Sequence, residues 1–252
     1  MSVQPLSVPP GGPSITIRRA KPEDAPACGQ VCFDAFCKIN TVHGFPPEFP
    51  STDAYVGILS MMFSHPGFYC VVAESDGCMV GSNCLDERSA IAGLGPITVD
   101  PSVQNRGVGR KLMEAVLVRA EERNFPGVRL LQSAFHNRSL ALYSRLGFAP
   151  REPVSVMQGP PLRKQVEGCS VRPAQESDVE DCKRVCSQVH GHDRGGELAD
   201  AIKDGTAMIV ERHDRITEYA TVLAFFGHAV VETNADLQAL IASAGANELQ
   251  LE

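Results

Sequence analysis

Val-Asp-Pro-Ser-Val-Gln-Asn-Arg-Gly-Val-Gly-Arg, residues 99–110, joins a predicted apolar strand to a predicted amphipathic helix. Glycines at a strand-to-helix turn expose successive backbone N–H groups at the positive end of the helix dipole. The stretch therefore predicts a layered α/β fold with a turn that suits a phosphate or a pyrophosphate. The apolar residues of the helix recur every four positions and share one face: Val108, Leu112, Val116 and Ala120.

This turn departs from two common nucleotide-binding patterns. The dinucleotide fingerprint needs a third glycine where this sequence has Leu112, and the mononucleotide loop needs a Gly-Lys-Ser/Thr run, which is absent. Arg106 and Arg110 add positive charge at the edge of the turn. A glycine turn that merely packs a helix on a sheet is the alternative interpretation, because two glycines alone are a weak signal.

A second motif, Asn-Arg-Ser-Leu-Ala-Leu-Tyr-Ser-Arg-Leu-Gly-Phe, follows at residues 137–148. Over roughly residues 15–156 the chain resembles the GNAT superfamily of acetyl-CoA-dependent N-acetyltransferases. The first motif resembles the pyrophosphate loop of that family (Gln/Arg-x-x-Gly-x-Gly/Ala), and the second resembles its Asn…Leu-Tyr…Gly-Phe signature. The resemblance implies an α/β fold with a mixed sheet. In this fold acetyl-CoA lies in a V-shaped gap between the strand ending at Val99 and the strand starting near Val128.

The resemblance also implies roles for the residues that match the motifs. The backbone of Ile97, Thr98 and Val99 is expected to bind the pantetheine arm, and the Val99 N–H is expected to stabilise the oxyanion. Asn137 is expected to contact the cofactor arm. Tyr143 is expected to protonate the departing thiolate, unless it only packs its helix on the sheet. The expected pyrophosphate-binding residues are Gln104, Asn105, Arg106, Gly107, Val108, Gly109 and Arg110.

The acceptor amine must lose a proton before it attacks. At pH 7 this costs roughly 4.6 kcal/mol for a lysine-like amine of pKa about 10.4, and about 1.4 kcal/mol for an α-amine near 8. Many relatives carry a glutamate on the strand that here spans residues 95–99, and this sequence has none there. Asp86 and Glu87 are the nearest candidate bases, acting directly or through water. Alternatively, they belong to a solvated turn held by Arg88.

The loop His-Gly-Phe-Pro-Pro-Glu-Phe-Pro at residues 43–50 contains three prolines. Such a composition is incompatible with a regular element and predicts a surface lid or wall. His43 and His65 flank this loop and are either substrate contacts or incidental loop histidines.

The chain contains an internal repeat. Residues 17–32 align without gaps with residues 171–186, and each copy predicts a strand, a helix starting near an aspartate, and two cysteines four residues apart. The second copy has no Gly-x-Gly over residues 230–240 and carries acidic residues where the first has arginines. We therefore expect the second copy not to bind pyrophosphate.

Four segments follow from these patterns: a disordered arm over residues 1–13, a catalytic module over 14–157, a linker over 158–168 and a partial, non-catalytic GNAT-like copy over 169–252. The second copy is expected to stop after about three strands and to leave an apolar face uncovered. That face would pack on the first module or form a homodimer. Its residues are Val210, Ile216, Val222, Leu223, Phe225 and Phe226.

Composition excludes several classes of protein. The 252 residues are 43% hydrophobic and 21% charged, which is typical of a folded globular protein. The net charge of -7 and the absence of a basic cluster richer than Arg18-Arg19-x-Lys21 argue against a nucleic-acid partner. No apolar run is long enough to span a membrane, and the first residues lack a secretory signal. We expect a cytoplasmic protein without a membrane partner.

The nine cysteines predict reduced thiols, because their number is odd and no export signal precedes them. A zinc site would combine Cys182 and Cys186 with His190 and His192. We do not expect a metal, because the repeated cysteine pair in the first copy has no comparable histidines nearby.

Together these observations predict an N-acetyltransferase that moves an acetyl group from acetyl-CoA to a primary amine by direct attack in a ternary complex. The acceptor is expected to be a small molecule or a peptide. The alternative is a regulatory or sensor protein that binds acyl-CoA without turnover, which the missing strand glutamate favours. The intact glycine turn and Tyr143 argue against a third alternative, a purely structural tandem scaffold.

Overall fold

The computed structural model describes residues 14–154, 157–158, 165–224, 227–243 and 250–251. The predicted arm over residues 1–13 and most of the predicted linker lie outside the described residues. The chain divides into two compact units. Unit 1 comprises residues 1–87 and 92–147, and unit 2 comprises residues 88–91 and 148–252, so the main division follows Gly147.

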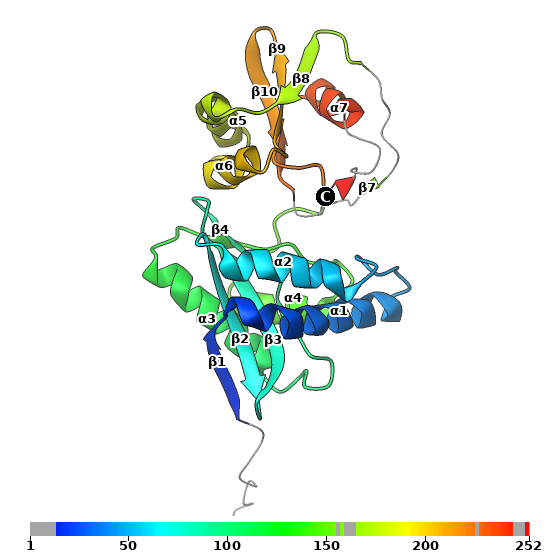
Figure 1. Ribbon diagram of the computed structural model, residues 1–252, viewed down its shortest axis with the longest axis vertical. Helices are drawn as coiled ribbons and strands as arrows, with labels where there is room; N and C mark the ends of the chain where they lie inside the picture. The colour runs from blue at the N-terminus through cyan, green and yellow to red at the C-terminus, as the bar shows by residue number, and fades with distance from the viewer. Residues whose placement is uncertain (1–13, 155–156, 159–164, 225–226, 244–249, 252) are drawn as a thin grey trace, which may run out of the picture. The chain divides into compact units, whose positions relative to one another are not determined.

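Unit 1 contains a mixed sheet in the order β1-β2-β3-β4-β6, with β5 paired to β3 (Figure 1). All pairings are antiparallel except that of β4 with β6, which is parallel. The strands are β1 (Ile15–Arg19), β2 (Phe68–Ser75), β3 (Cys78–Asp86), β4 (Ala92–Leu94), β5 (Thr98–Val99) and β6 (Val128–Arg129). The helices are α1 (Ala25–Val42), α2 (Thr52–Ser64), α3 (Val108–Glu122) and α4 (Asn137–Arg145).

The sheet of unit 1 has helices on both faces, with α1 and α2 in front and α3 and α4 behind in Figure 1. Residues of α1 and α2 form one hydrophobic cluster with β2 and β3. The predicted apolar face of α3 is buried: Val108, Leu112, Val116 and Ala120 are at most 4% exposed. Burial of this face explains why α3 forms where the fourfold apolar spacing predicts it.

The strand predicted over residues 95–99 forms only at its end, as β5, and β4 ends just before the predicted range. Pro96 lies between them and has no N–H to donate to a ladder, so pairing to β3 is interrupted there. Gly81 lets β5 approach β3 closely, because a Cβ at Gly81 would lie 2.6 Å from the carbonyl oxygen of Thr98.

Unit 2 contains a four-stranded antiparallel sheet in the order β11-β10-β9-β8 and a short β7-β12 pair. The strands are β7 (Met157–Gln158), β8 (Cys169–Pro173), β9 (Met208–Arg212), β10 (Arg215–Ala220), β11 (Ala229–Val231) and β12 (Gln250–Leu251). The helices are α5 (Val179–His190), α6 (Gly195–Lys203) and α7 (Asn234–Ser243). Helices α5 and α6 pack in one hydrophobic cluster with this sheet, and α7 packs in another.

The internal repeat corresponds to the same local structure in both units. Arg18 bonds Asp24 through both terminal nitrogens (2.7 and 2.8 Å) and also bonds Glu74 (2.9 Å from Nε). Arg172 bonds Asp178 and Glu211 in the same pattern. In each unit this cluster ties the opening strand to the turn before the first helix, and the arginine lowers the pKa of the aspartate.

The expectation of an uncovered apolar face in the second copy was wrong. The sheet has four strands rather than about three, and α7 covers it. Val210 and Leu223 pack with Leu240 of α7, and Ile216 is buried in the cluster with α5 and α6. Phe225 and Phe226 lie outside the described residues. The argument for a homodimer through this face therefore falls away.

Glu218 of β10 is a buried carboxyl with no exposed surface, and neither of its oxygens has a hydrogen-bond partner among the described residues. Burial, followed by the nearby charge of Asp236, raises the pKa of Glu218 to about 9. The carboxyl is therefore protonated in the folded chain at neutral pH.

We expect the Glu218→Gln variant to remove part of the pH dependence of stability. Glu218 favours the fold below its unfolded pKa of about 4.5, and this contribution is lost as pH rises toward the folded pKa of about 9. Urea unfolding of the full chain should show the variant gaining about 2 to 4 kcal/mol over the wild type between pH 5 and pH 8. If the difference in unfolding free energy between the variant and the wild type does not change with pH, Glu218 is hydrated in the folded chain.

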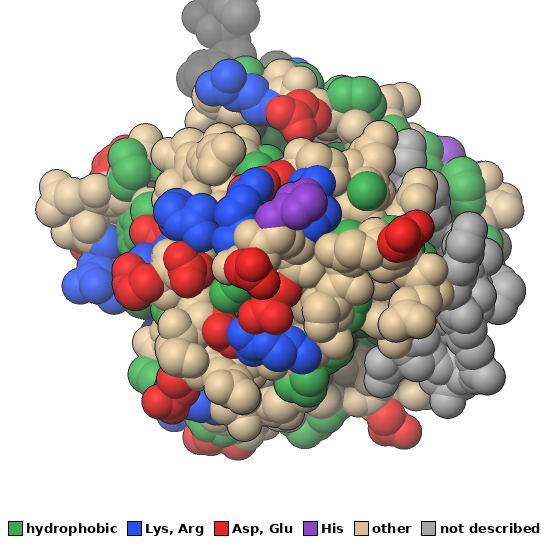
Figure 2. Space-filling view, turned by 90° about the horizontal axis from the view of Figure 1, so that it is seen from above, with side chains coloured by type: hydrophobic (Ala, Val, Ile, Leu, Met, Phe, Trp, Pro, Cys, Tyr) green, Lys and Arg blue, Asp and Glu red, His purple; other side chains and the backbone are tan. Residues whose placement is uncertain are grey.

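The surface carries both signs of charge. On the face turned to the viewer in Figure 2, Asp and Glu side chains lie among Lys and Arg side chains.

Among the helices of the described residues, none is long and apolar enough to cross a membrane.

Candidate functional site

The turn between β5 and α3 has a fixed backbone. Asp100 accepts hydrogen bonds from the N–H and the hydroxyl of Ser102, both at 2.7 Å. Asn105 and Gly107 have positive φ angles of 66° and 82°, and Gly107 immediately precedes α3. The first turn of α3 contains no acidic residue, and no side chain caps the helix at Gly107. No carboxylate of that turn therefore neutralises the positive end of the helix dipole.

The first turn of α4 is fastened to this glycine turn. Arg138 donates to the side-chain oxygen of Gln104 at 2.7 Å, and Gln104 donates from Nε2 to the Val99 carbonyl at 3.0 Å. Arg138 was not singled out by the sequence analysis, although it follows Asn137 directly in the second motif. Its guanidinium adds positive charge beside Gln104, while Arg106 and Arg110 are exposed and Arg110 pairs with Glu114 (2.8 Å).

Strands β4 and β6 pair at two positions of the described residues. Ala92 pairs with Val128 and Gly93 with Arg129, and no further pairing with β6 is described as the chain continues to Val99. This is the divergence expected of the strands that end at Val99 and begin near Val128. A gap in the backbone ladder therefore opens next to β5, on the side away from β3.

The register of β5 directs the Val99 N–H into this gap. Asp100 donates to the Val80 carbonyl at 2.9 Å, which makes this opposing pair a hydrogen-bonded one. Hydrogen-bonded and non-hydrogen-bonded pairs alternate along an antiparallel ladder. The Gly81–Val99 pair is therefore of the non-hydrogen-bonded kind, and the backbone groups of Val99 point away from β3.

Thr98 has the opposite orientation. By the same alternation, Thr98 and Ser82 form a hydrogen-bonded pair. The N–H and the carbonyl of Thr98 therefore point toward β3. Its hydroxyl lies 3.4 Å from the Cys32 sulfur of α1. Of the three backbone contacts expected for the pantetheine arm, Val99 has the suitable orientation and Thr98 does not, whereas Ile97 precedes β5 and is not placed by this register.

Tyr143 lies on α4 close to the glycine turn. The side chain of its neighbour Leu142 would be 3.6 Å from a Cβ placed at Gly109. Tyr143 is 8% exposed, and burial raises the pKa of its phenol, partly offset by a hydrogen bond with Ser139. The phenol is therefore protonated at neutral pH and can donate a proton.

Helix α4 begins at Asn137, the first residue of the second motif. The His136 side chain accepts a hydrogen bond from the Ser139 N–H at 3.1 Å and caps the helix. Burial and the nearby Arg138 lower the pKa of His136, which keeps its ring neutral and able to accept this bond. Asn137 is exposed in the first turn of α4. Its neighbour Arg138 bonds Gln104, so Asn137 lies beside the glycine turn.

Residues 34–148 match the family model described as Acetyltransferase (GNAT) family. Unit 1 of this chain is a GNAT acetyltransferase domain. A mycothiol acetyltransferase of Nocardia farcinica (strain IFM 10152) is 37% identical over 65 residues, which are 26% of this chain and 22% of that protein. The chain thus matches about a fifth of the length of this curated relative.

Solved structures share the fold. A candidate acetyltransferase from Pyrococcus horikoshii has a TM-score of 0.67 at 19% identity, over 90% of this chain and 75% of its own. A mutant protein of Bacillus halodurans has a TM-score of 0.50 at 15% identity, over 57% of this chain and 98% of its own. At these identities the likeness concerns the fold of the GNAT domain and not its substrate.

The two predicted carboxylates do not lie at the level of Val99 in the GNAT domain. Val99 is opposite Gly81, and Asp86 follows Gly81 by five residues along β3, which is about 17 Å at roughly 3.4 Å per residue. Glu87 is bound by Arg119 through two hydrogen bonds of 2.6 and 3.0 Å. The distance from an amine at Val99 to either carboxylate is too long for direct proton transfer.

The solvated turn proposed as the alternative is also incorrect for Glu87, because its side chain is 9% exposed and paired with Arg119. Arg88, which is grouped with unit 2, pairs with Asp200 of that unit at 3.0 Å. Glu48, in the proline-containing loop over residues 43–50, is a carboxylate that no sequence motif marks. This carboxylate hydrogen-bonds Tyr55, and its charge contributes to the raised pKa of Cys32.

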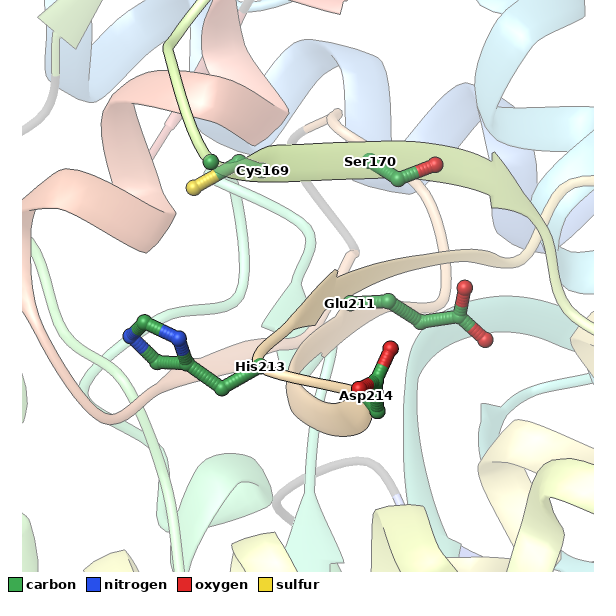
Figure 3. Close-up of a pocket in the computed structure, with 6 residues that line it drawn as sticks. Cys169, Ser170, Glu211, His213 and Asp214 are labelled. Carbon is green, nitrogen blue, oxygen red and sulfur yellow. The ribbon is translucent and has the colours of Figure 1, made fainter.

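A separate pocket of about 300 Å³ lies in unit 2 and contains none of the predicted site residues. It is lined by Gly168, Cys169, Ser170, Glu211, His213 and Asp214. In Figure 3 the His213 ring points away from the Glu211 carboxylate, so these groups do not converge on one point. In the stretches that the structure describes, no group of three or more His, Cys, Asp or Glu residues is placed to hold a metal ion.

Proposed function

We propose that this protein transfers the acetyl group of acetyl-CoA to a primary amine by direct attack in a ternary complex. The observation that carries the proposal is the Val99 N–H, which points into the gap beside β5, next to the glycine turn of α3. A backbone donor fixed in this way can stabilise the oxyanion that forms when an amine attacks a thioester. The match to a protein named mycothiol acetyltransferase supports acetyl transfer as the reaction class.

In this proposal the residues of the turn and of α4 have separate roles. The amides around Gly107, Val108 and Gly109 bind the pyrophosphate, with Gln104, Asn105, Arg106, Arg110 and the unpredicted Arg138 at the edge of the turn. The backbone of Ile97 and the side chain of Asn137 bind the pantetheine arm. The amine nitrogen forms the new bond to the acetyl carbon while the Val99 N–H donates to the thioester carbonyl. As the C–S bond breaks, the Tyr143 hydroxyl donates its proton to the departing sulfur, and the proton lost by the amine passes to water.

Unit 2 is proposed to be a degenerate copy that binds no acetyl-CoA. At the start of α7, the position that corresponds to the glycine turn, Asp236 is fully buried and bonded to Arg212 (2.8 Å) and to Thr233 (2.7 Å). Glu232 lies just before it and pairs with Arg215. These carboxylates would repel a pyrophosphate, and the two arginines are already engaged.

Release of free CoA thiol from the full-length protein tests the proposal. We expect thiol release to depend on an added primary amine and one acetyl group to appear on that amine per thiol released. A panel of small amines and peptides with free N-termini would cover both acceptor classes. Acetyl-CoA binding without amine-dependent thiol release across the panel would instead support the sensor alternative.

A further inference from the structure

Two loops of unit 1 that are about ninety residues apart in sequence meet through aromatic rings. Phe45 of the α1–α2 loop stacks on Phe135, which lies between β6 and α4, with ring centroids 4.6 Å apart and planes 15° apart. The ring of His43 lies 4.8 Å from Phe135 at 31°. Phe45 is nevertheless 52% exposed, so much of this ring surface faces solvent.

These three rings lie next to the start of α4, because Phe135 precedes Asn137 by two residues, and Arg138 of α4 bonds Gln104 of the glycine turn. Helix α1 contacts β5 through Cys32 and Thr98, and eleven residues later His43 contacts Phe135. At about 1.5 Å per residue the helix covers roughly 16 Å between these contacts. It therefore runs from β5 to the segment after β6 and crosses the gap on the sheet face opposite α3 and α4.

The α1–α2 loop is held firmly at its other end. Phe49 packs edge-on against Tyr55 of α2 with ring centroids 5.1 Å apart, and Glu48 hydrogen-bonds the hydroxyl of Tyr55. Tyr55 is itself stacked on Phe36 of α1 at 5.8 Å. The loop predicted to be a lid or a wall is thus anchored on both sides of Pro46 and Pro47. Phe45 is held in place before a ligand arrives, which lowers the entropic cost of binding.

We propose that the stacked rings of Phe45 and Phe135, bordered by His43, form the acceptor surface and select an amine with an aromatic or flat apolar ring. This inference rests on the proposed acetyl transfer at Val99. The glycine turn and Tyr143 belong to α3 and α4, so the acceptor approaches from the α1 side, where the rings are exposed. A ring laid on this surface buries apolar area on both partners and gains stacking geometry that an aliphatic chain lacks.

Two amines of similar pKa, a phenylalkyl amine and an aliphatic amine of equal length without the ring, test the proposal on the full chain. We expect the phenylalkyl amine to have a KM about tenfold lower. Phe45→Ala should remove this preference while kcat and acetyl-CoA affinity stay within a few-fold, because the ring contact contributes binding and not chemistry. Phe45→Leu should recover only part of the preference.

Val118→Ala is the matched control, since it removes another apolar side chain of similar exposure (53%) from α3. It should leave both KM values unchanged. A structural role of Phe45 alone would raise KM for both amines equally and would overturn the proposal. Equal KM values for the two amines in the wild type would also overturn the proposal. That result would leave the proposed acetyl transfer in place.

Calorimetric titration of the phenylalkyl amine into the CoA-bound protein separates this proposal from the proposed function. Binding that Phe45→Ala weakens about tenfold, without any acetyl transfer, would support the surface and reject the transferase. Transfer to amines without such binding would support the transferase and reject the surface.

Discussion

Replacement of Gly109 by aspartate is expected to lower acetyl-CoA affinity by at least about 100-fold. Gly109 is the second residue of α3, within the amides proposed to bind the pyrophosphate. A carboxylate about 5 Å from one phosphate charge is repelled by about 3 kcal/mol at an effective dielectric constant near 20, which corresponds to more than a hundredfold in affinity. Isothermal calorimetry with acetyl-CoA measures the change.

The loss should not come from unfolding. A Cβ at Gly109 would lie 3.6 Å from the side chains of Leu142 and Val99, which is ordinary contact. An aspartate in the first turn of a helix is also favourable for the helix dipole. Gly109→Asn is the matched control, since it adds the same volume without the charge and should retain most of the affinity that Gly109→Asp loses. Unchanged affinity in a folded Gly109→Asp variant would reject the pyrophosphate assignment.

Tyr143→Phe is expected to lower kcat by about 100-fold and to leave the dissociation constant of acetyl-CoA within a few-fold. General acid catalysis contributes about this factor or more, and the hydroxyl acts when the thiolate leaves. Because burial raises the pKa of Tyr143, the phenol keeps its proton at neutral pH. Steady-state kinetics at saturating amine provides the measurement.

Tyr219→Phe serves as the control, because it also removes a buried phenol hydroxyl, in a cluster of unit 2 that holds none of the proposed site residues. Its kcat should remain within a few-fold of the wild type. Equal turnover by the Tyr143→Phe variant and the wild type would mean that Tyr143 only packs α4 on the sheet.

The positions of most elements could be predicted because their signals are local. Helices α3 (Val108–Glu122) and α4 (Asn137–Arg145) form where the two motifs lie. The glycine turn, the motif of α4 and the repeated strand-to-helix segment are contiguous patterns. Their conformations depend mainly on glycine geometry, helix capping and apolar spacing within about a dozen residues. The family of unit 1 follows from these segments alone.

The site required information that no single segment contains. The direction of the Val99 N–H depends on the register of β5 against β3, and one residue of slip would reverse it. The same register separates Asp86 from Val99, although both end strands of one sheet and looked close in sequence. The meeting of Phe45 with Phe135 depends on the path of α1 across the gap.

The sequence by itself determined the family of unit 1, the glycine turn of α3 and the presence of a second copy that lacks this turn. Tertiary structure alone decided which backbone groups face the gap, which carboxylates lie too far from it, and that α7 covers the sheet of unit 2. The physical reason is the range of the interactions. Helix caps and turns depend on neighbouring residues, whereas strand register and ring stacking depend on the packing of segments tens of residues apart.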